Sequence, residues 1–310
     1  MAMTRENSQA PESGEQELVS APMRSLYEIT KLRNIRSSMK SESRSIGSYV
    51  EDDFISRGVL SIDRAEELFG FFNQTMNQYL WGGIALKHDS LNSVRSSSSL
   101  LSAAVLTVSA LHVPGKDEIF DTCYNEFVTV VSNSMLNRYH SLDEIRGLCI
   151  GAFWLSDLSW KLSGHAVRIA TEINLHQSLQ KLLRGASDEY ERAQLWYLLY
   201  VLDHHFSIAY QRPPIIHENQ AIRSYELFLQ CPSTVPGDVR LVCQVALFAV
   251  LTKAHNAFGS DIEPLSEQDF ILLRAFNVEV EQWRLLWQPR SGKPKLPFFM
   301  ASFPNRIRSG

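Results

Sequence analysis

Residues 191–216 read ERAQLWYLLYVLDHHFSIAYQRPPII. From Leu195 to Leu202 almost every side chain is apolar, so a helix over this segment has no polar face to turn toward water. Pro213 and Pro214 prevent the helix from continuing, because proline lacks an amide hydrogen and restricts the residue before it. The stretch therefore predicts a central buried helix that ends at about Tyr210 and is followed by extended chain.

Helical periodicity extends to both sides of this segment. Apolar residues recur at helical spacing over residues 100–112, 117–138, 142–156, 159–175, 219–229, 238–258 and 267–287. Capping boxes are predicted at Asp63–Glu66, opening a helix to about Leu80, at Ser141–Glu144 and at Asp188–Glu191. No strand-like alternation, Asn-Gly or Asp-Gly hairpin turn, or repeat of fixed period is found in the sequence. The sequence therefore predicts an all-α, multi-helix domain.

The two ends of the chain differ in composition from the rest. Residues 1–45 are rich in Ser, Glu, Arg and Lys, which predicts a disordered linker; its basic part is otherwise a localisation signal or a phosphate-contacting arm. Residues 291–310 combine prolines with basic residues and lack a helical period, which predicts a disordered tail. The predicted regulatory domain occupies residues 50–290.

Composition excludes several classes of protein. The net charge of −4 gives no basic footprint for gripping nucleic acid. The N-terminus is polar, without the apolar segment of a secretory signal. The apolar stretches 100–111 and 241–251 are shorter than a bilayer of ~30 Å requires, which predicts buried helices and no membrane partner. Four scattered cysteines favour reduced core thiols in an intracellular protein over a disulfide framework.

Motifs for catalysis are missing or incomplete. The sequence has no G-x-S-x-G elbow, Walker A loop or G-x-G-x-x-G turn. His217-Glu218 starts like H-E-x-x-H but lacks the second histidine, and Asp52-Asp53 lacks the further acids of a terpene synthase magnesium site. His204 and His205 project about 100° apart on a helix, which favours structural histidines over a shared metal. We therefore expect no enzyme activity, no bound metal and no cofactor.

Two segments carry a resemblance to a known family. Residues 163–177, SGHAVRIATEINLHQ, and residues 191–216 follow one another with the order and spacing of the fungal-specific transcription factor domain. This domain is the middle homology region of fungal zinc-cluster regulators. Its hallmark is a Gly-x-Ala-x-x-x-Ala helix ending in Gly-Leu-His, then an aromatic helix that closes with Asp, Ser and Gly-Arg-Pro-Pro. Residues 53–61 and 65–69 are similar to the opening segment of the domain.

The chain departs from the family pattern at several positions. Asn174 stands where Gly is usual, and Asn also tolerates a left-handed helix terminus. Gln211 replaces the Gly before Arg-Pro-Pro, and Ala193-Gln194 replace part of the arginine run, which leaves the local contacts of these residues open. The sequence has no C-x-x-C and hence no six-cysteine zinc cluster, the module that reads DNA in the family. Within the family, the chain resembles activators of secreted proteases and regulators of metabolite gene clusters.

The residues of the two segments that resemble the family's hallmark have a physical interpretation that requires no catalysis. Asp203 directly follows the buried run, and a buried carboxylate needs a partner, for which Arg212 and Arg168 are the best candidates. Arg168, Glu172 and His176 fall at i, i+4 steps on one stripe, which predicts a local ladder. We predict an interhelical clamp, or alternatively a clamp that borders an effector or coregulator pocket, built from Arg168, Glu172, His176, Asp203, Arg212, Pro213 and Pro214.

The resemblance implies a regulatory domain that acts in the nucleus on transcription by RNA polymerase II. Its expected partners are transcription coregulators or a DNA-binding partner chain, with a small-molecule effector as a further candidate. Without the zinc cluster, the chain itself is expected to bind DNA weakly and without sequence preference. The alternative is a helical scaffold or interaction protein with no transcriptional role.

Overall fold

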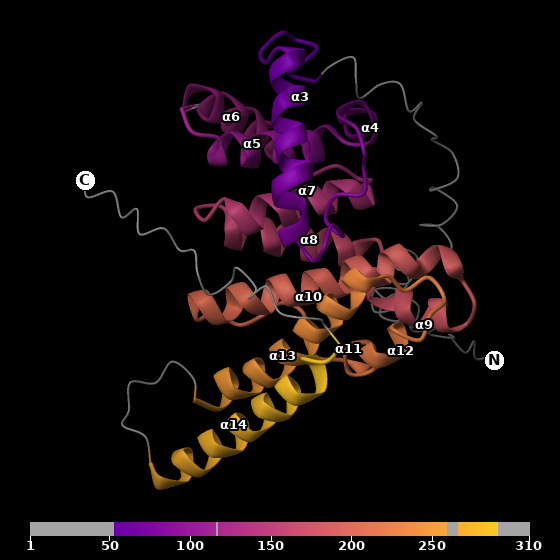
Figure 1. Cartoon of the computed structure of the whole chain (residues 1–310), viewed down its shortest axis with the longest axis vertical. Coiled ribbons are helices and arrows are strands. Elements are labelled where there is room, and N and C mark those ends of the chain that lie inside the picture. The colour runs from indigo at the N-terminus through magenta and orange to yellow at the C-terminus, as the bar shows by residue number, and fades with distance from the viewer. Residues whose placement is uncertain (1–52, 116, 259–265, 291–310) are drawn as a thin grey trace, which may run out of the picture. The chain divides into compact units, whose positions relative to one another are not determined.

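The computed structural model of the chain describes residues 53–115, 117–258 and 266–290. The predicted linker, residues 1–45, and the predicted tail, residues 291–310, lie outside the described residues. Within the described ranges the secondary structure is helical and contains no strand, which confirms the all-α prediction (Figure 1).

The helices follow one another along the chain with short connections. Their bounds are α3 (Ile62–Phe71), α4 (Leu91–Ser97), α5 (Ser99–His112), α6 (Asp117–Ser134), α7 (Leu142–Trp154), α8 (Ser159–Glu172), α9 (Ser178–Leu183), α10 (Tyr190–Tyr210), α11 (Gln220–Arg223), α12 (Tyr225–Phe228), α13 (Pro236–Phe258) and α14 (Glu267–Trp287). A π-helical turn, Phe72–Met76, and a 3-10 turn, Asn77–Tyr79, extend α3.

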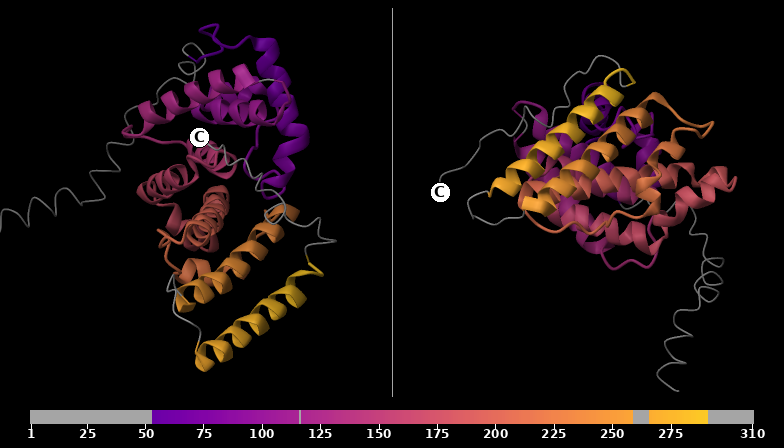
Figure 2. Two further views of the ribbon diagram at one scale, coloured as in Figure 1. Left: turned by 90° about the vertical axis from the view of Figure 1, so that its left-hand side faces the viewer. Right: turned by 90° about the horizontal axis from the view of Figure 1, so that it is seen from below.

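Helix α10 is the central element predicted from the sequence. It packs against α7 and α8 on one side and α13 on the other (Figure 1). Every residue from Ala193 to His204 is buried, which confirms that this helix has no water-facing side in that stretch. Helix α13 in turn packs against α14, which lies beside α13 and away from the other helices (Figure 2).

Two glycines in α7 allow the neighbouring helices to approach closely. A Cβ atom added to Gly147 would come within 2.9 Å of the Leu101 backbone in α5, and one added to Gly151 within 2.7 Å of the Phe127 ring in α6. No Cβ atom tolerates such distances, so a larger residue at either position would push α7 away from α5 or α6.

The helix starts confirm the prediction in part. Ser141 and Glu144 form the predicted capping box of α7. The predicted box at Asp63 is wrong, because α3 begins at Ile62 after Ser61, and Asp63 lies inside the first turn. Asp188 does not cap α10 either, because a 3-10 turn, Ser187–Glu189, leads directly into it.

The second apolar stretch, predicted to be too short to span a bilayer, lies within a longer helix that does not fit this prediction. Residues 241–251 belong to a helix of 23 residues, α13, which is long and apolar enough to cross a membrane by length and composition. A core helix of a folded domain satisfies the same criteria, and α13 packs between α10 and α14. The first stretch, 100–111, lies within α5 and is buried as predicted from Leu100 to Ala110, while Leu111 is 43% exposed.

Candidate functional site

The candidate site lies where α10 ends and the chain turns back along it. Gln211 adopts a left-handed conformation, with φ of 53° and ψ of 47°. The amide of Arg212 donates to the Ser207 carbonyl over 2.9 Å, and that of Gln211 to the Ile208 carbonyl over 3.3 Å. This is the Schellman arrangement that satisfies the last carbonyls of a helix, and it requires the left-handed residue for which Gly is usual. Here Gln211 carries out that role.

The two prolines after this turn determine which amides reach Asp203. Pro213 and Pro214 have no amide hydrogen, so the first free donors after Arg212 belong to Ile215 and Ile216. Both amides donate to Asp203 Oδ2, over 2.7 and 2.8 Å. The carboxylate therefore holds residues 215–216 against the helix from which it projects.

Asp203 is fully buried, and these two donors are its hydrogen-bond partners among the described residues. Its side chain has no exposed surface, and its other oxygen, Oδ1, is buried with no hydrogen-bond partner among the described residues. Burial raises the pKa of the Asp203 carboxyl above its usual range, against the opposing effect of the two backbone amides. The carboxylate is a fixed structural acceptor at the centre of the domain.

The predicted pair between Asp203 and Arg212 does not form. Arg212 is exposed, and its guanidinium lies over the Trp160 ring at 5.0 Å and the Tyr210 ring at 5.8 Å. Tyr210 also donates from its hydroxyl to the Ser156 carbonyl over 3.2 Å. Two backbone amides bind one oxygen of the buried carboxylate in place of a cation, and Arg212 instead links the end of α10 to α8 by cation–π contacts.

The predicted ladder of Arg168, Glu172 and His176 is not formed either. Arg168 and Glu172 are exposed on α8, and no ion pair joins these residues in the part of the chain that the structure describes. Asn174, left-handed with φ of 64°, ends the helix before His176 and so interrupts the i, i+4 register. His176 instead packs beside Trp196 of α10, with ring centroids 6.0 Å apart, and burial lowers its pKa.

His204 provides a second link from α10 to the returning chain. Its Nε2 lies 2.8 Å from the Ile216 carbonyl, and its Nδ1 lies 2.6 Å from Thr252 Oγ1 on α13. A carbonyl only accepts, so Nε2 carries the proton and Nδ1 accepts from the threonine hydroxyl. Burial lowers the pKa of His204 to about 4, so the ring is neutral near pH 7. Both ring nitrogens are partnered within the domain, as expected for a structural histidine.

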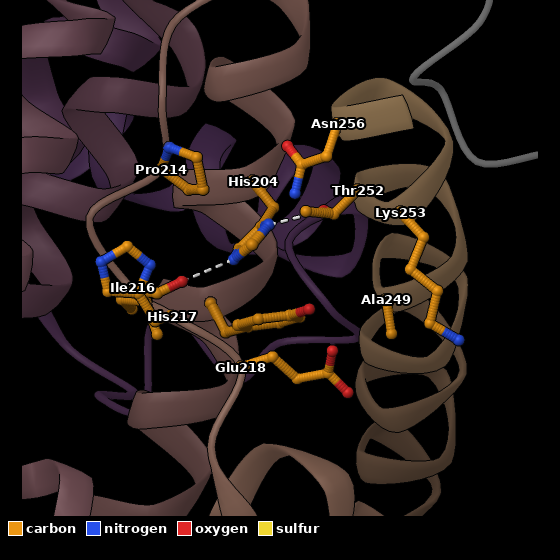
Figure 3. Close-up of a pocket in the computed structure, with 10 residues that line it drawn as sticks. His204, Pro214, Ile216, His217, Glu218, Ala249, Thr252, Lys253 and Asn256 are labelled. Atoms are coloured by element: carbon orange, nitrogen blue, oxygen red, sulfur yellow. Dashed lines mark hydrogen bonds between the residues drawn. The ribbon is translucent and has the colours of Figure 1, made fainter. Parts of the chain in front are cut away.

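A small pocket lies beside this link (Figure 3). Its volume is about 110 Å³, and it is bordered by Pro214 and Ile216 from the returning chain. Its other lining residues are Tyr200, His204, His217, Glu218, Ala249, Thr252, Lys253 and Asn256. Sites for drug-sized ligands usually measure about 300–1,000 Å³, so this pocket has room for a few waters or a very small molecule. The clamp borders a pocket, but one too small for a typical metabolite.

Sequence reasoning missed a second buried carboxylate, Asp238 at the start of α13. Gln194 Nε2 donates to its Oδ1 over 2.5 Å, while the Tyr190 hydroxyl and the Val235 amide donate to its Oδ2. Gln194 is one of the residues that depart from the family's arginine run, and here it donates to this carboxylate from α10. The sequence does contain one signal for this site, because Asp238 lies in the first turn of a predicted helix, where a carboxylate is stabilised by the helix dipole.

A third buried carboxylate, Asp53, joins the start of the described chain to α4. Arg95 Nε donates to Asp53 Oδ2 over 2.5 Å, and Arg95 Nη2 donates to Asp53 Oδ1 over 2.8 Å. Burial raises the pKa of Asp53, but the hydrogen bonds from Arg95 and Ser56 outweigh this and hold it below its usual range. The partners are 42 residues apart, so no local pattern pairs them.

Charged side chains also connect the segment before α4 to α7 and α10. Asp143 accepts from Arg146 over 2.5 Å and contacts His88 Nε2 over 2.8 Å. Glu191 accepts from Lys87 over 2.8 Å and from Arg146 over 3.1 Å. The same network includes Ser93, whose Oγ lies 2.7 Å from His88 Nδ1, and its contacts join the segment before α4 to α7 and α10. In the described ranges, no group of three His, Cys, Asp or Glu side chains gathers closely enough to hold a metal ion.

Comparison with known proteins gives this arrangement a family. The family model described as the middle domain of the transcriptional activator of proteases prtT matches residues 58–304. The transcriptional activator of proteases prtT of Emericella nidulans is 63% identical over 292 residues, which are 94% of this chain and 44% of that protein. The chain thus spans less than half the length of this relative. No solved structure matches the chain.

Proposed function

The chain belongs to the family of the middle domain of prtT transcriptional activators of proteases, and we propose that it is the regulatory domain of a fungal regulator of protease genes. It controls their transcription by RNA polymerase II, acts in the nucleus and carries no catalytic activity. Of the two subgroups that the sequence resembles, the comparisons support the activators of proteases.

The observation that carries this proposal is the extent of the family match. It runs from residue 58 to residue 304 and so includes all the helices from α3 to α14. The clamp supports the same proposal, because Asp203 holds the returning chain against α10, His204 contacts Thr252 of α13 and Arg212 lies over Trp160 of α8. These residues of the family's hallmark thus join three helices into one helical body.

Such a body regulates through its surface, so we propose protein partners in preference to a small effector. The partners are transcription coregulators or a DNA-binding partner chain. The pocket beside His204, with a volume of about 110 Å³, adds no support for a drug-sized effector at that place. DNA reading belongs to a zinc cluster, for which this sequence has no C-x-x-C.

A segment exchange tests the proposal. In Emericella nidulans, the part of prtT that corresponds to residues 58–304 is replaced by those residues of this chain, and secreted protease activity and protease transcripts are measured. We expect both to approach the unmodified strain, whereas a strain with the segment deleted differs from it. The deletion strain is the control that shows the segment matters.

The alternative, a scaffold without a transcriptional role, makes a different prediction. If the exchanged protein accumulates and enters the nucleus but protease transcripts stay at the level of the deletion strain, the regulatory proposal is wrong. Immunoblots of nuclear fractions distinguish this outcome from failure of the chimaera to fold.

A further inference from the structure

Helix α14 has an apolar stripe on the side that faces away from the domain. Its core-facing side is marked by Trp287, which is buried, and by Trp283, whose Nε1 donates to the Cys243 carbonyl of α13 over 2.8 Å. Ile271, Val278 and Leu285 lie on the opposite side of the helix and are 67%, 56% and 65% exposed. In Figure 2 α14 lies alongside α13 at the outer edge of the described helices.

The spacing of these three residues is regular. They recur every seven residues, which places them within about 20° of one line along an α-helix. Such a seven-residue apolar stripe is the usual surface by which one helix packs against another. Phe270, Leu272, Leu273 and Leu286 of α14 are exposed as well, by 37% to 51%, but the three stripe residues are the most exposed of the set. An apolar surface of this kind marks a site for a partner.

The charges beside the stripe identify the partner. Arg274 and Glu281 lie on the same side of it, four residues from Val278 in one direction and three in the other. In an antiparallel pair of α14 helices related by a two-fold axis at Val278, Ile271 of one chain meets Leu285 of the other. Arg274 then lies about 1.5 Å along the axis from Glu281 of the second copy. In this register the surface places apolar residues against apolar residues and opposite charges against each other.

We propose that α14 is a self-association surface through which two copies of this chain pair in antiparallel fashion about Val278. Two-fold pairing is the usual symmetry of homodimers, because one patch serves both subunits. It places two Val278 side chains together at the axis, flanked by two Ile271–Leu285 contacts and two Arg274–Glu281 ion pairs. Glu281 contacts Arg284 in its own helix over 2.8 Å, and pairing adds Arg274 of the second copy.

The first experiment measures mass against concentration for the full chain of 35.3 kDa by sedimentation velocity. We expect the mass to rise toward that of two chains with concentration. Val278→Glu places two like charges at the axis and should weaken the dimer at least tenfold. Leu136→Glu is the matched control, because Leu136 is 94% exposed outside α14, and this change should leave the dimer unaffected.

The second experiment uses charge reversal and does not depend on any one variant. Arg274→Glu and Glu281→Arg each create two repulsive pairs in a homodimer, so each protein alone should be largely monomeric. An equimolar mixture restores two attractive pairs and should form a heterodimer, which native mass spectrometry resolves by mass. Circular dichroism confirms that each variant folds.

Three results would overturn the proposal. One is a chain that stays monomeric at every concentration, because its own residues or another protein then cover the stripe. Another is a dimer that Val278→Glu does not weaken, which places the interface elsewhere. The third is a mixture of the two charge-reversed chains that associates no better than either chain alone.

Discussion

The carboxylate of Asp203 and the amide of Ile216 are joined by a hydrogen bond of 2.8 Å that closes the chain on itself across 13 residues. A second amide, that of Ile215, shares the same oxygen over 2.7 Å. The bonds fix the segment that leaves α10, and through His204 they connect it to α13.

Removal of the Asp203 carboxylate tests this arrangement. Asp203→Ala strands two buried amide donors, and we expect it to lower the free energy of unfolding by about 2–5 kcal/mol. Arg212→Ala should cost only about 0.5–1 kcal/mol, because it removes exposed cation–π contacts. Urea denaturation measures both. Since the two side chains do not touch, the double variant should equal the sum within about 0.5 kcal/mol; a coupling well above that would restore the ion pair that the sequence suggested.

The left-handed residue at the end of α10 offers a stabilising substitution. Gln211 has φ of 53°, where a side chain costs about 1–2 kcal/mol that glycine avoids. Gln211→Gly should therefore raise the free energy of unfolding, by up to about 1 kcal/mol, since glycine also gains freedom in the unfolded chain. In the matched control Gln180→Gly, inside α9, glycine should lower stability by about 0.5–1 kcal/mol. Thermal denaturation measures both, and equal signs would refute the argument.

The buried pair of Asp53 and Arg95 should behave as a coupled unit. Arg95→Ala leaves a buried carboxylate unpaired and should cost about 3–5 kcal/mol. Arg95→Lys keeps the charge but cannot make both hydrogen bonds, so it should restore only part of the loss. The double variant Asp53→Ala, Arg95→Ala should lose far less than the sum of its parts. Arg64→Ala, which breaks an exposed pair with Glu67, serves as control and should change stability by less than about 1 kcal/mol.

Acid should weaken the network around Asp143 before it weakens the core. Burial raises the pKa of Asp143, but hydrogen bonds from Ser97, Arg146 and His88 outweigh this and hold it below its usual range. A folded-state pKa below the unfolded value of about 3.9 stabilises the fold above that pH, and this contribution is lost as the pH falls further. The stability difference between the native chain and Asp143→Asn should therefore shrink as the pH falls below about 4. A difference that stays constant or grows between about pH 5 and about pH 2 would contradict this, and Asp63→Asn on the exposed start of α3 is the control.

The sequence predicted the helices well where a local pattern determines them. Helix α14 occupies residues 267–287 as predicted, and α10 ends at Tyr210, because apolar periodicity and prolines act on neighbouring residues. The short helices α4 and α9 were missed, since seven and six residues carry too little periodicity. The region predicted as one helix, 219–229, is two short helices that meet at Ser224.

The site was predicted less well, for a physical reason. The sequence indicates that Asp203 is a buried carboxylate, but it predicts a cation as its partner, where the structure has two backbone amides. Every residue except proline has a backbone amide, so the sequence does not show which amides bind the carboxylate. The pair of Asp53 with Arg95 depends on contacts between distant parts of the chain, which composition and spacing do not encode. Gln211 was noticed as a departure from the family pattern, and the left-handed turn explains why Gly is usual there.

The one-sided attachment of α14 has a consequence for hydrogen exchange. Helix α14 packs mainly against α13. Its other contacts with described residues are made by few side chains, such as Trp287, which lies beside Tyr225. Opening of α14 exposes little of the core, so its amides should take up deuterium through a local fluctuation, well before those of α10, which exchange only when the whole domain unfolds. If two copies pair through α14, the protection of its amides from exchange should rise with protein concentration. No other helix should show this dependence.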